Sequence, residues 1–301
     1  MNKKVRLPFK LNTHMKRTGL SLLLLLLPLT ALFAQSKVME SLKMKSDILG
    51  REVSYSVYLP DDYSVSERYY PVLYLLHGWT DNETSWLQMG DMKRITDQTI
   101  GSGKAVRMLI VMPDAGESWY VNSFDGKERY EDMFFQELIP FIQQTYRARA
   151  GKQYRAVSGL SMGGYGSFLY SLHHPDAFIA CAPLSAAIYT DEMMEKSKGN
   201  TRGQLFDKLY GKGNLTDHWY KNSVLYLLEK MQEKETPDVY YYIDCGDDDT
   251  LLHGNNRVHE IMQKKGIRHE FRVRDGGHTW TYWRTALPDV LEFVSKRFNR
   301  S

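Results

Sequence analysis

Residues 154–169, YRAVSGLSMGGYGSFL, constrain the fold of this chain more than any other segment. A short run of β-branched and apolar residues opens the segment and favours a buried strand, and an apolar helical run with small residues closes it. Ser161 lies between the two runs, with Gly159 and Gly163 each two residues away. A side chain at either position would collide with the neighbouring strand or with the turn, so glycine is favoured there. The pattern is typical of a sharp strand-to-helix turn that holds a strained serine with its hydroxyl exposed.

Apolar runs alternate with helical patterns along most of the chain. Continuous apolar runs, typical of strands buried on both faces, occupy residues 71–76, 108–112, 154–157, 178–183, 239–243 and 270–273. Helical patterns occupy residues 89–100, 130–146, 162–172, 251–265 and 282–298. Residues 41–60 alternate apolar and polar side chains about Gly50, which predicts an antiparallel pair. The chain is therefore expected to form an α/β fold, a mostly parallel central sheet flanked by helices.

Residues 189–235 interrupt this alternation. They are polar and aromatic, and they separate the fourth buried run from the fifth. We expect an insertion over the site, partly helical near 224–230, rather than a separate domain. The chain shows no internal repeat and no low-complexity linker.

The first 34 residues have the composition of a secretory signal. Six basic residues, and no acidic one, precede or border a short leucine-rich run, and small residues follow it near Ala34 and Gln35. An uncleaved membrane anchor is the alternative interpretation. Cleavage would change the formal net charge from +3 to −3, which removes the compositional support for a nucleic-acid or anionic-membrane partner. We expect an exported protein without a stable membrane span, in which residues 35–301 form one domain.

The two cysteines, Cys181 and Cys245, lie in separate runs that resemble buried strands. In an exported protein they could pair, but cysteine is among the most buried residue types and two cysteines make no disulfide framework. We expect two buried free thiols.

Ser161 needs a base and an acid to act as a nucleophile. A histidine must take the hydroxyl proton, and a carboxylate must orient that histidine and stabilise its charge. In α/β-hydrolases the order along the chain is serine, acid, histidine, each on a loop after a strand. The run 239–243 leads into Asp247, Asp248 and Asp249, and the run 270–273 leads into Gly276-Gly277-His278. His278 is therefore the expected base, and the residues alone leave the choice among the three aspartates open.

The oxyanion of a tetrahedral intermediate needs two N–H donors. One is expected to be the amide of Met162, at the start of the helix after Ser161, and the other the amide of Trp79, after the strand 71–76. His77 precedes the serine, so we expect it to make a structural hydrogen bond within its loop. Neither the aspartate run nor the pair His173-His174 has zinc-site spacing, and no EF-hand pattern occurs, so we expect no metal and no cofactor.

Five segments together carry a family resemblance: LYLLHGWTDNETSW, VMPDAGESWYVNS, GLSMGGYGS, the GDDD loop and DGGHTWTYWRTAL. With them the chain resembles the esterase D-like α/β-hydrolases, which include feruloyl and acetyl xylan esterases of carbohydrate esterase family 1, S-formylglutathione hydrolases, siderophore esterases and mycolyltransferases. The resemblance covers residues 41–298, with the motifs in the family's order. It implies Ser161 as nucleophile, His278 as base and Asp249 as acid, with Asp248 close enough to stay open. It also implies oxyanion amides at Trp79 and Met162 and an acyl pocket near Ser118, Trp119 and Tyr120.

Aromatic residues gather on the loops that follow strands, where they could stack on a sugar or an aromatic acyl group. Of these residues, Trp119, Tyr120 and Trp280 are the expected substrate contacts. A formylglutathione hydrolase needs a cytosolic thiol pool, so the signal segment argues against that activity. The expected function is an exported serine carboxylesterase that cleaves acetyl or feruloyl-type esters of plant polysaccharides. The alternatives are a siderophore or general short-chain esterase, an acyltransferase on the same triad, and a non-catalytic carbohydrate-binding module.

Overall fold

The computed structural model describes residues 1, 35–213, 215–232 and 237–298. The expected signal segment therefore lies outside the described residues, apart from Met1. Among the helices that are described, none combines the length and the apolar character that crossing a membrane requires.

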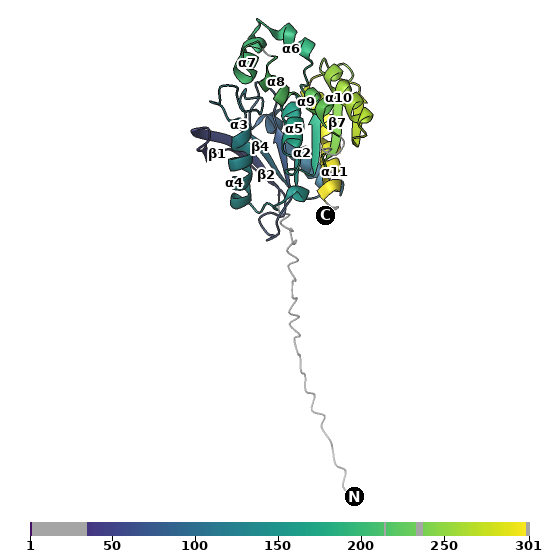
Figure 1. Cartoon of the computed structure of the whole chain (residues 1–301). Coiled ribbons are helices and arrows are strands. Elements are labelled where there is room, and N and C mark those ends of the chain that lie inside the picture. Colours follow the sequence, from purple (N-terminus) through teal and green to yellow (C-terminus); the bar gives the residue numbers. More distant parts are fainter. Residues whose placement is uncertain (2–34, 214, 233–236, 299–301) are drawn as a thin grey trace. The chain divides into compact units, whose positions relative to one another are not determined.

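An eight-stranded sheet forms the centre of the domain (Figure 1). Its order is β1-β2-β4-β3-β5-β6-β7-β8. The strands are β1 (Lys37–Ser46), β2 (Arg51–Leu59), β3 (Val72–Leu76), β4 (Leu109–Pro113), β5 (Arg155–Leu160), β6 (Ala180–Leu184), β7 (Tyr240–Gly246) and β8 (His269–Arg274). The pairs β1·β2 and β2·β4 are antiparallel, and every other pair in the sheet is parallel. The expected hairpin about Gly50 and the expected mostly parallel sheet are both confirmed.

Alternation along each central strand divides the core between the two faces of the sheet. In β3, Val72, Tyr74 and Leu76 join one core cluster, whereas Leu73 and Leu75 join the other. All five residues of this strand are buried, as are all five of β4 and of β6. A strand covered on both faces can therefore be apolar throughout, which is why these runs carry so few polar residues.

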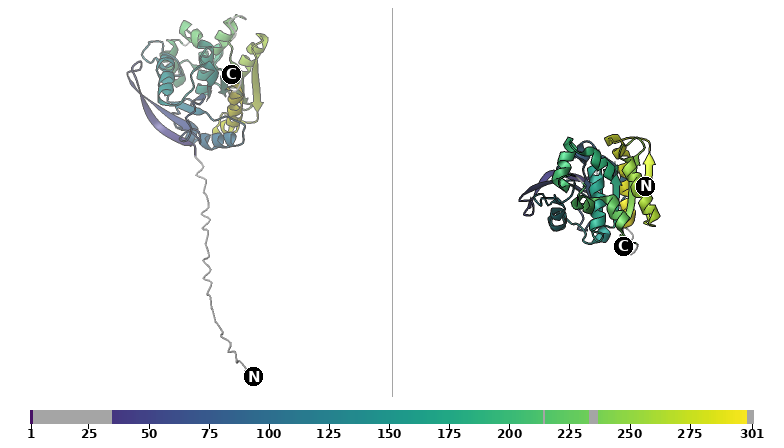
Figure 2. Two further views of the ribbon diagram at one scale, coloured as in Figure 1. Left: turned by 90° about the horizontal axis from the view of Figure 1, so that it is seen from below. Right: turned by 45° about the horizontal axis from the view of Figure 1, so that its top comes forward.

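Helices cover both faces of the sheet. The helices outside the insertion are α1 (Ser85–Gln88), α2 (Met92–Gly101), α3 (Tyr130–Met133), α4 (Ile139–Thr145), α5 (Met162–His173), α10 (Leu252–Lys264) and α11 (Trp280–Phe298). Apolar residues of α3, α4, α5 and α10 belong to the first core cluster, and those of α2 and α11 to the second. Figure 2 gives two further views of this layering. A π-helical turn, η1 (Phe134–Leu138), joins α3 to α4 within the single helix expected over 130–146.

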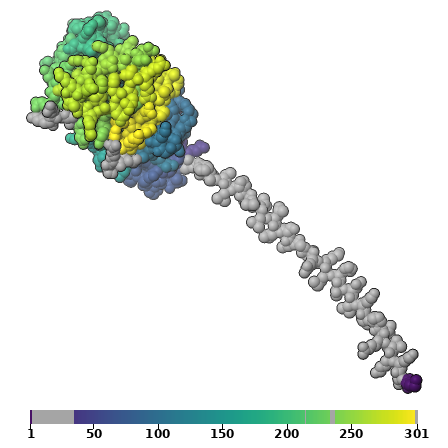
Figure 3. Space-filling view, turned by 90° about the vertical axis from the view of Figure 1, so that its right-hand side faces the viewer, coloured from purple at the N-terminus to yellow at the C-terminus, as the bar shows by residue number. Residues whose placement is uncertain are grey.

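The C-terminal helix α11 lies beside α2. Arg284 Nη1 donates to the Met89 carbonyl at 3.0 Å, and the Val106 amide donates to Ser295 Oγ at 3.0 Å. In Figure 3 the yellow surface of this helix accordingly adjoins the blue surface of the earlier segment. A short 3-10 turn, η2 (Lys152–Tyr154), leads into β5.

The insertion is more helical than expected. Its described residues form α6 (Asp191–Ser197), α7 (Thr201–Tyr210), α8 (Asp217–Asn222) and α9 (Val224–Lys230), of which sequence analysis predicted α9. Each helix begins with a polar side chain that accepts a hydrogen bond from an amide of its first turn. These N-caps are Thr190, Asn200, Thr216 and Ser223. Helices of six to ten residues are too short to show a clear apolar period, so only their N-cap residues could have indicated in the sequence where they begin.

Candidate active site

The elbow between β5 and α5 holds Ser161 in a strained backbone conformation. The φ angle of Ser161 is 55° and its ψ angle is −117°. The Ser161 amide donates to the Leu184 carbonyl at 3.0 Å, and its own carbonyl accepts from the Ala187 amide at 2.9 Å. Two bonds to the end of β6 and the loop after it thus hold a conformation that a non-glycine residue rarely adopts.

Close packing around the elbow explains its glycines. A Cβ atom on Gly159 would lie 2.6 Å from the carbonyl carbon and oxygen of Gly163. A Cβ atom on Gly163 would lie 2.6 Å from the carbonyl oxygens of Leu76 and His77. These distances are below any real Cβ contact, so the expected collisions with the turn and with the neighbouring strand are confirmed.

The structure brings Ser161, His278 and Asp249 together in one hydrogen-bonded chain. His278 Nε2 lies 3.0 Å from Ser161 Oγ, and His278 Nδ1 lies 2.8 Å from Asp249 Oδ2. An ionised carboxylate can only accept, so Nδ1 carries the proton and Nε2 is free to accept the serine hydroxyl. This is the arrangement that a serine nucleophile and its general base require. The catalytic roles of the three residues stay a prediction.

Asp249 is held as a carboxylate at the bottom of the site. Its side chain is fully buried, and its second oxygen, Oδ1, accepts from the Leu251 amide at 2.8 Å. Burial alone would raise the pKa of Asp249, but the hydrogen bonds from His278 and from the Leu251 amide outweigh burial and lower it. Asp249 is therefore ionised at neutral pH and can stabilise a charged imidazole.

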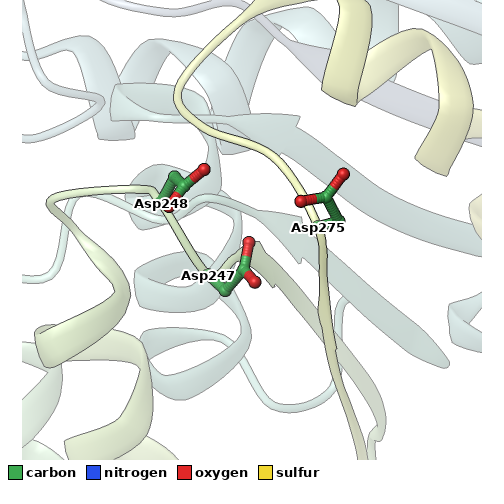
Figure 4. A group of neighbouring side chains, drawn as sticks. All are labelled: Asp247, Asp248 and Asp275. Atoms are coloured by element: carbon green, nitrogen blue, oxygen red, sulfur yellow. The ribbon is translucent and has the colours of Figure 1, made fainter.

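The other two aspartates of the loop point elsewhere. Asp247, Asp248 and Asp275 are exposed, and their carboxylates approach one another closely enough that one oxygen of each lies within 4.8 Å of the others (Figure 4). Asp247 Oδ1 accepts from the Gly276 amide at 2.9 Å, so this side chain ties the acid loop to the loop that carries His278. Exposed acidic groups are common without an ion, and we assign no metal to this one.

Two backbone amides are available for an oxyanion. Neither the Trp79 amide nor the Met162 amide has a hydrogen-bond acceptor among the residues that the structure describes. Met162 is the first residue of α5, where a helix leaves its amides without partners. The Trp79 loop lies against the nucleophile, because a Cβ atom on Gly78 would be 3.6 Å from Ser161 Cβ. The two amides fit the donor roles predicted for them, which stay a prediction.

His77 supports the Trp79 loop through hydrogen bonds. Its Nδ1 atom lies 2.7 Å from the Gly78 carbonyl and its Nε2 atom accepts from the Ala115 amide at 2.8 Å. The ring is therefore neutral with its proton on Nδ1. The expected structural hydrogen bond within the loop is confirmed, and a second bond reaches the loop after β4.

Trp119 and Tyr120, two of the expected substrate contacts, are buried in this structure, and their contact with substrate stays a prediction. Tyr120 is fully buried, and its hydroxyl donates to the His77 carbonyl at 2.9 Å, so it supports the Trp79 loop from beneath. Trp119 is 3% exposed, because rings of Tyr165, Tyr189 and Phe206 surround it. Both residues have positive φ angles, which turn their side chains inward in a way that the sequence does not reveal. Trp280 is partly exposed, and its substrate contact stays a prediction.

Sequence analysis missed a pair, Ser185 and Trp283, that supports His278 and Asp249. The Trp283 ring meets the His278 ring edge-on, with centroids 4.9 Å apart. Trp283 Nε1 donates to Ser185 Oγ at 3.1 Å, and hydrogen bonding to Ser185 also contributes to the lowered pKa of Asp249. Ser185 directly follows β6 and has a φ of 44°. A serine after a buried strand carries no distinctive pattern, so its role depends on the folded geometry.

Known proteins are similar to this chain in sequence and in fold. The model of the esterase family, described as "Putative esterase", matches residues 46–294. An endo-1,4-beta-xylanase/feruloyl esterase of Xylanibacter ruminicola is 29% identical over 83% of the chain, which spans 30% of that protein's length. An acetyl esterase of Caldicellulosiruptor saccharolyticus is 25% identical over 74% of the chain and 83% of its own length. A solved structure of a ferulic acid esterase has a TM-score of 0.77 and 34% identity, and covers 88% of this chain and 99% of its own.

The family model covers most of the chain, including the elbow and the loops of Asp249 and His278. The solved relative matches the same sheet and helices over nearly its whole length. The resemblance to the esterase D-like group is thereby confirmed, and the chain belongs to the esterase family of α/β-hydrolases.

Proposed function

We propose that this chain is an exported serine carboxylesterase that hydrolyses acetyl or feruloyl-type esters of plant polysaccharides. The observation that carries the proposal is the hydrogen-bonded chain from Ser161 through His278 to the buried Asp249. The family match supports ester hydrolysis. The substrate class is supported by the names of two relatives, a xylanase/feruloyl esterase and an acetyl esterase.

Acylation follows from the geometry of the three side chains. Ser161 Oγ attacks the ester carbonyl carbon while His278 Nε2 takes its proton. The buried Asp249 carboxylate stabilises the imidazolium that forms, and the amides of Trp79 and Met162 donate to the oxyanion. His278 then gives the proton to the leaving alkoxide, which departs as the alcohol and leaves an acyl group on Ser161.

In deacylation water is the nucleophile, Ser161 is the leaving group, and His278 again acts first as base and then as acid. His278 takes a proton from the water, and the resulting hydroxide adds to the acyl carbon. The tetrahedral intermediate collapses, Ser161 recovers its proton from His278, and the carboxylic acid leaves. The His278 side chain is 34% exposed, so water can reach it.

The proposal also includes export of the protein and the bounds of its mature domain. The six basic residues and the leucine-rich run of residues 1–34 support cleavage of a signal near residue 34, which would leave residues 35–301 as the mature single domain with 189–235 as its insertion. Expression of the full chain with N-terminal sequencing of the exported product tests this. A mature protein that begins at Met1, or that stays with the membrane fraction, would contradict it.

Hydrolysis by the mature protein and by a Ser161→Ala variant tests the activity. Suitable substrates are 4-nitrophenyl acetate, methyl ferulate and acetylated xylan. We expect turnover that is highest on ferulate or xylan and that falls by at least 10³-fold in the variant. Activity restricted to 4-nitrophenyl acetate would favour a general short-chain or siderophore esterase. Acylated sugar in a reaction with added acceptor would favour an acyltransferase, and binding of xylan without any turnover would favour a carbohydrate-binding role.

A further inference from the structure

Arg202 of the insertion lies over two aromatic rings beside the candidate active site. It is the second residue of α7. Its guanidinium carbon lies 5.3 Å from the centroid of the Trp79 ring and 5.8 Å from that of Tyr189. An arginine in this position gains from both rings, and this contact leaves its in-plane N–H groups without a hydrogen-bond acceptor.

The Arg202 guanidinium lacks a polar partner within the described part of the chain. Its Nε atom is buried and has no hydrogen-bond acceptor there, and no carboxylate of the described residues lies within 4.0 Å of the group. Arg68, by contrast, stacks on Tyr70 and also forms an ion pair with Asp62. A buried donor without a partner is costly, so the arrangement at Arg202 needs an explanation beyond packing.

The two rings beneath Arg202 belong to loops that flank the nucleophile. Trp79 follows Gly78, whose backbone packs against Ser161. Tyr189 lies two residues after Ala187, whose amide donates to the Ser161 carbonyl at 2.9 Å. The guanidinium therefore lies over side chains from the two loops that contact Ser161.

The chemistry around Arg202 favours a carboxylate as its ligand. The planar fork of N–H groups matches the two oxygens of a carboxylate, whereas a neutral hydroxyl would satisfy one donor. Trp79 Nε1 also donates to Glu117 at 2.9 Å, so an acidic side chain shares the indole on which Arg202 lies. That negative charge disfavours a dianionic phosphate more than a singly charged carboxylate.

We propose that Arg202 binds a carboxylate carried by the ester substrate and so gives the enzyme a preference for acidic esters. The carboxylate belongs either to the alcohol side, as on a uronic acid of an acetylated polysaccharide, or to the acyl side, as in a dicarboxylic monoester. The inference rests on the proposed function, because it names a substrate class for the same serine.

Two matched substrate pairs test the proposal and separate the two sources. The first pair is an acetylated glucuronoxylan oligosaccharide and the same compound with its uronic carboxylate converted to the amide. The second is the mono-4-nitrophenyl ester of adipic acid and its terminal amide. The readout is the ratio of kcat/KM for the acid to kcat/KM for the amide, measured for the wild type, Arg202→Met, Arg202→Lys and Lys208→Met. Lys208 is an exposed cation on the same helix and controls for the loss of one charge.

We expect one pair to show a preference for the acid that falls about ten- to hundredfold in Arg202→Met, falls less in Arg202→Lys and persists in Lys208→Met. The pair that shows the preference identifies the side that carries the carboxylate. An acid-to-amide ratio of kcat/KM near one in the wild type, or an equal ratio in the wild type and Arg202→Met, would overturn the inference. Hydrolysis of the neutral esters in the same experiment would still support the proposed function. Loss of serine-dependent turnover on every ester would reject both.

A binding measurement keeps the inference testable without turnover. Calorimetry with Ser161→Ala is expected to show tighter binding of the acidic oligosaccharide or of adipic acid monoamide than of the neutral counterpart. The added change Arg202→Met is expected to remove that difference, with the thermal midpoint checked to show that the double variant folds. Equal binding of acid and amide by Ser161→Ala would refute a carboxylate site at Arg202.

Discussion

At the scale of single residues, the candidate site depends on which of three adjacent aspartates faces His278. Asp249 is buried and accepts from His278, whereas Asp248 is exposed beside Asp247 and Asp275. The aspartates are chemically identical, so only the path of the loop after β7 distinguishes them.

Replacing Asp249 by Asn is expected to lower kcat roughly 10³–10⁴-fold, because an amide neither fixes the Nδ1 proton of His278 nor stabilises its charge. The matched change Asp248→Asn is expected to alter kcat less than threefold, since its side chain lies outside the hydrogen-bonded chain. Initial rates on 4-nitrophenyl acetate measure both. Comparable losses of kcat in the two variants would show that the assignment of Asp249 as the acid is wrong.

The sequence is most informative where a residue's role depends on its order along the chain. Ser161 and His278 could be identified because each follows a recognisable strand in the order expected of the fold. Tyr120 and Arg202 could not be placed in this way. Whether Tyr120 turns inward depends on a positive φ angle, and the position of Arg202 depends on how α7 packs over the two loops, neither of which leaves a pattern in local composition.

At the scale of elements, a buried charge cluster attaches the insertion to the elbow helix. Glu131 of α3 accepts from His173 Nδ1 at 2.8 Å and from His174 Nε2 at 2.9 Å, at the end of α5. His173 Nε2 meets the Lys221 carbonyl of α8 at 2.9 Å. Both nitrogens of His173 thus face acceptors, and only the doubly protonated ring donates to both.

The pKa values agree with a charged pair. Burial opposes both charges, but the hydrogen bonds and attraction between the partners prevail, so the pKa of Glu131 falls to about 2 and that of His173 rises above its ordinary 6.5. The contribution of Glu131 is present above its ordinary pKa of 4.5 and is lost as pH falls towards 2. That of His173 is complete below 6.5 and is lost as pH rises through its raised value.

We therefore expect the free energy of unfolding to fall between pH 6.5 and 9 by about 1–2 kcal/mol more in the wild type than in His173→Gln, which cannot ionise. Urea unfolding at several pH values measures this slope. His253→Gln, at an exposed histidine of α10, serves as the control and is expected to keep the wild-type slope. The expectation fails if His173→Gln and the wild type respond to pH alike.

A second buried carboxylate joins the last two strands to α11. Asp244 of β7 accepts from the hydroxyls of Tyr242 at 2.7 Å and Tyr282 at 2.5 Å and from Arg274 Nη2 at 2.5 Å. Its side chain is fully buried. Tyr282 lies in the first turn of α11, four residues after His278, so the carboxylate also fixes the loop that carries His278.

Replacing Asp244 by Asn is expected to destabilise the fold by about 2–4 kcal/mol, because the amide leaves Arg274 with an incomplete partner and presents N–H groups to other donors. The change Asp289→Asn removes the second and more exposed of the two carboxylates that pair with Arg274, and it is expected to cost less than about 1 kcal/mol. Urea unfolding of the two variants compares them. Equal costs would show that Asp244 contributes no more than a surface ion pair.

Elements differ in how well their sequences predict them. The strands of the sheet and the helices α5, α10 and α11 were predictable because long apolar runs and helical periods mark them. The expected single helix over 130–146 contains a π-helical turn instead, and α6, α7 and α8 went unnoticed. Both differences arise where local hydrogen bonding, rather than apolar spacing, determines the structure.

At the scale of the whole domain, stability comes from two apolar layers without a covalent cross-link. The order of the strands in the sheet could not be predicted from the sequence, because each buried run has the same apolar character. Cys181 and Cys245 are both free and buried. Burial raises the pKa of the Cys181 thiol to about 12, so neither reactivity nor pairing is favoured in the folded state.

A reductant is consequently expected to leave the thermal midpoint unchanged within about 1 °C, since no disulfide contributes to the fold. A maleimide reagent is expected to label both thiols after unfolding in urea and to label neither at a comparable rate before it. Mass spectrometry counts the labels. A fall in the midpoint with reductant, or a mature protein that takes no label once unfolded, would reveal a disulfide.

The position of His278 near the C-terminal end of the described residues has a consequence for synthesis of the chain. Ser161 and His278 are 117 residues apart, and the strand before His278 is β8, the last in the chain and the edge of the sheet. A chain emerging from a ribosome presents Ser161 long before His278. Under the proposed mechanism, hydrolysis requires that the final strand and helix have docked, so an incompletely synthesised chain is expected to be inert.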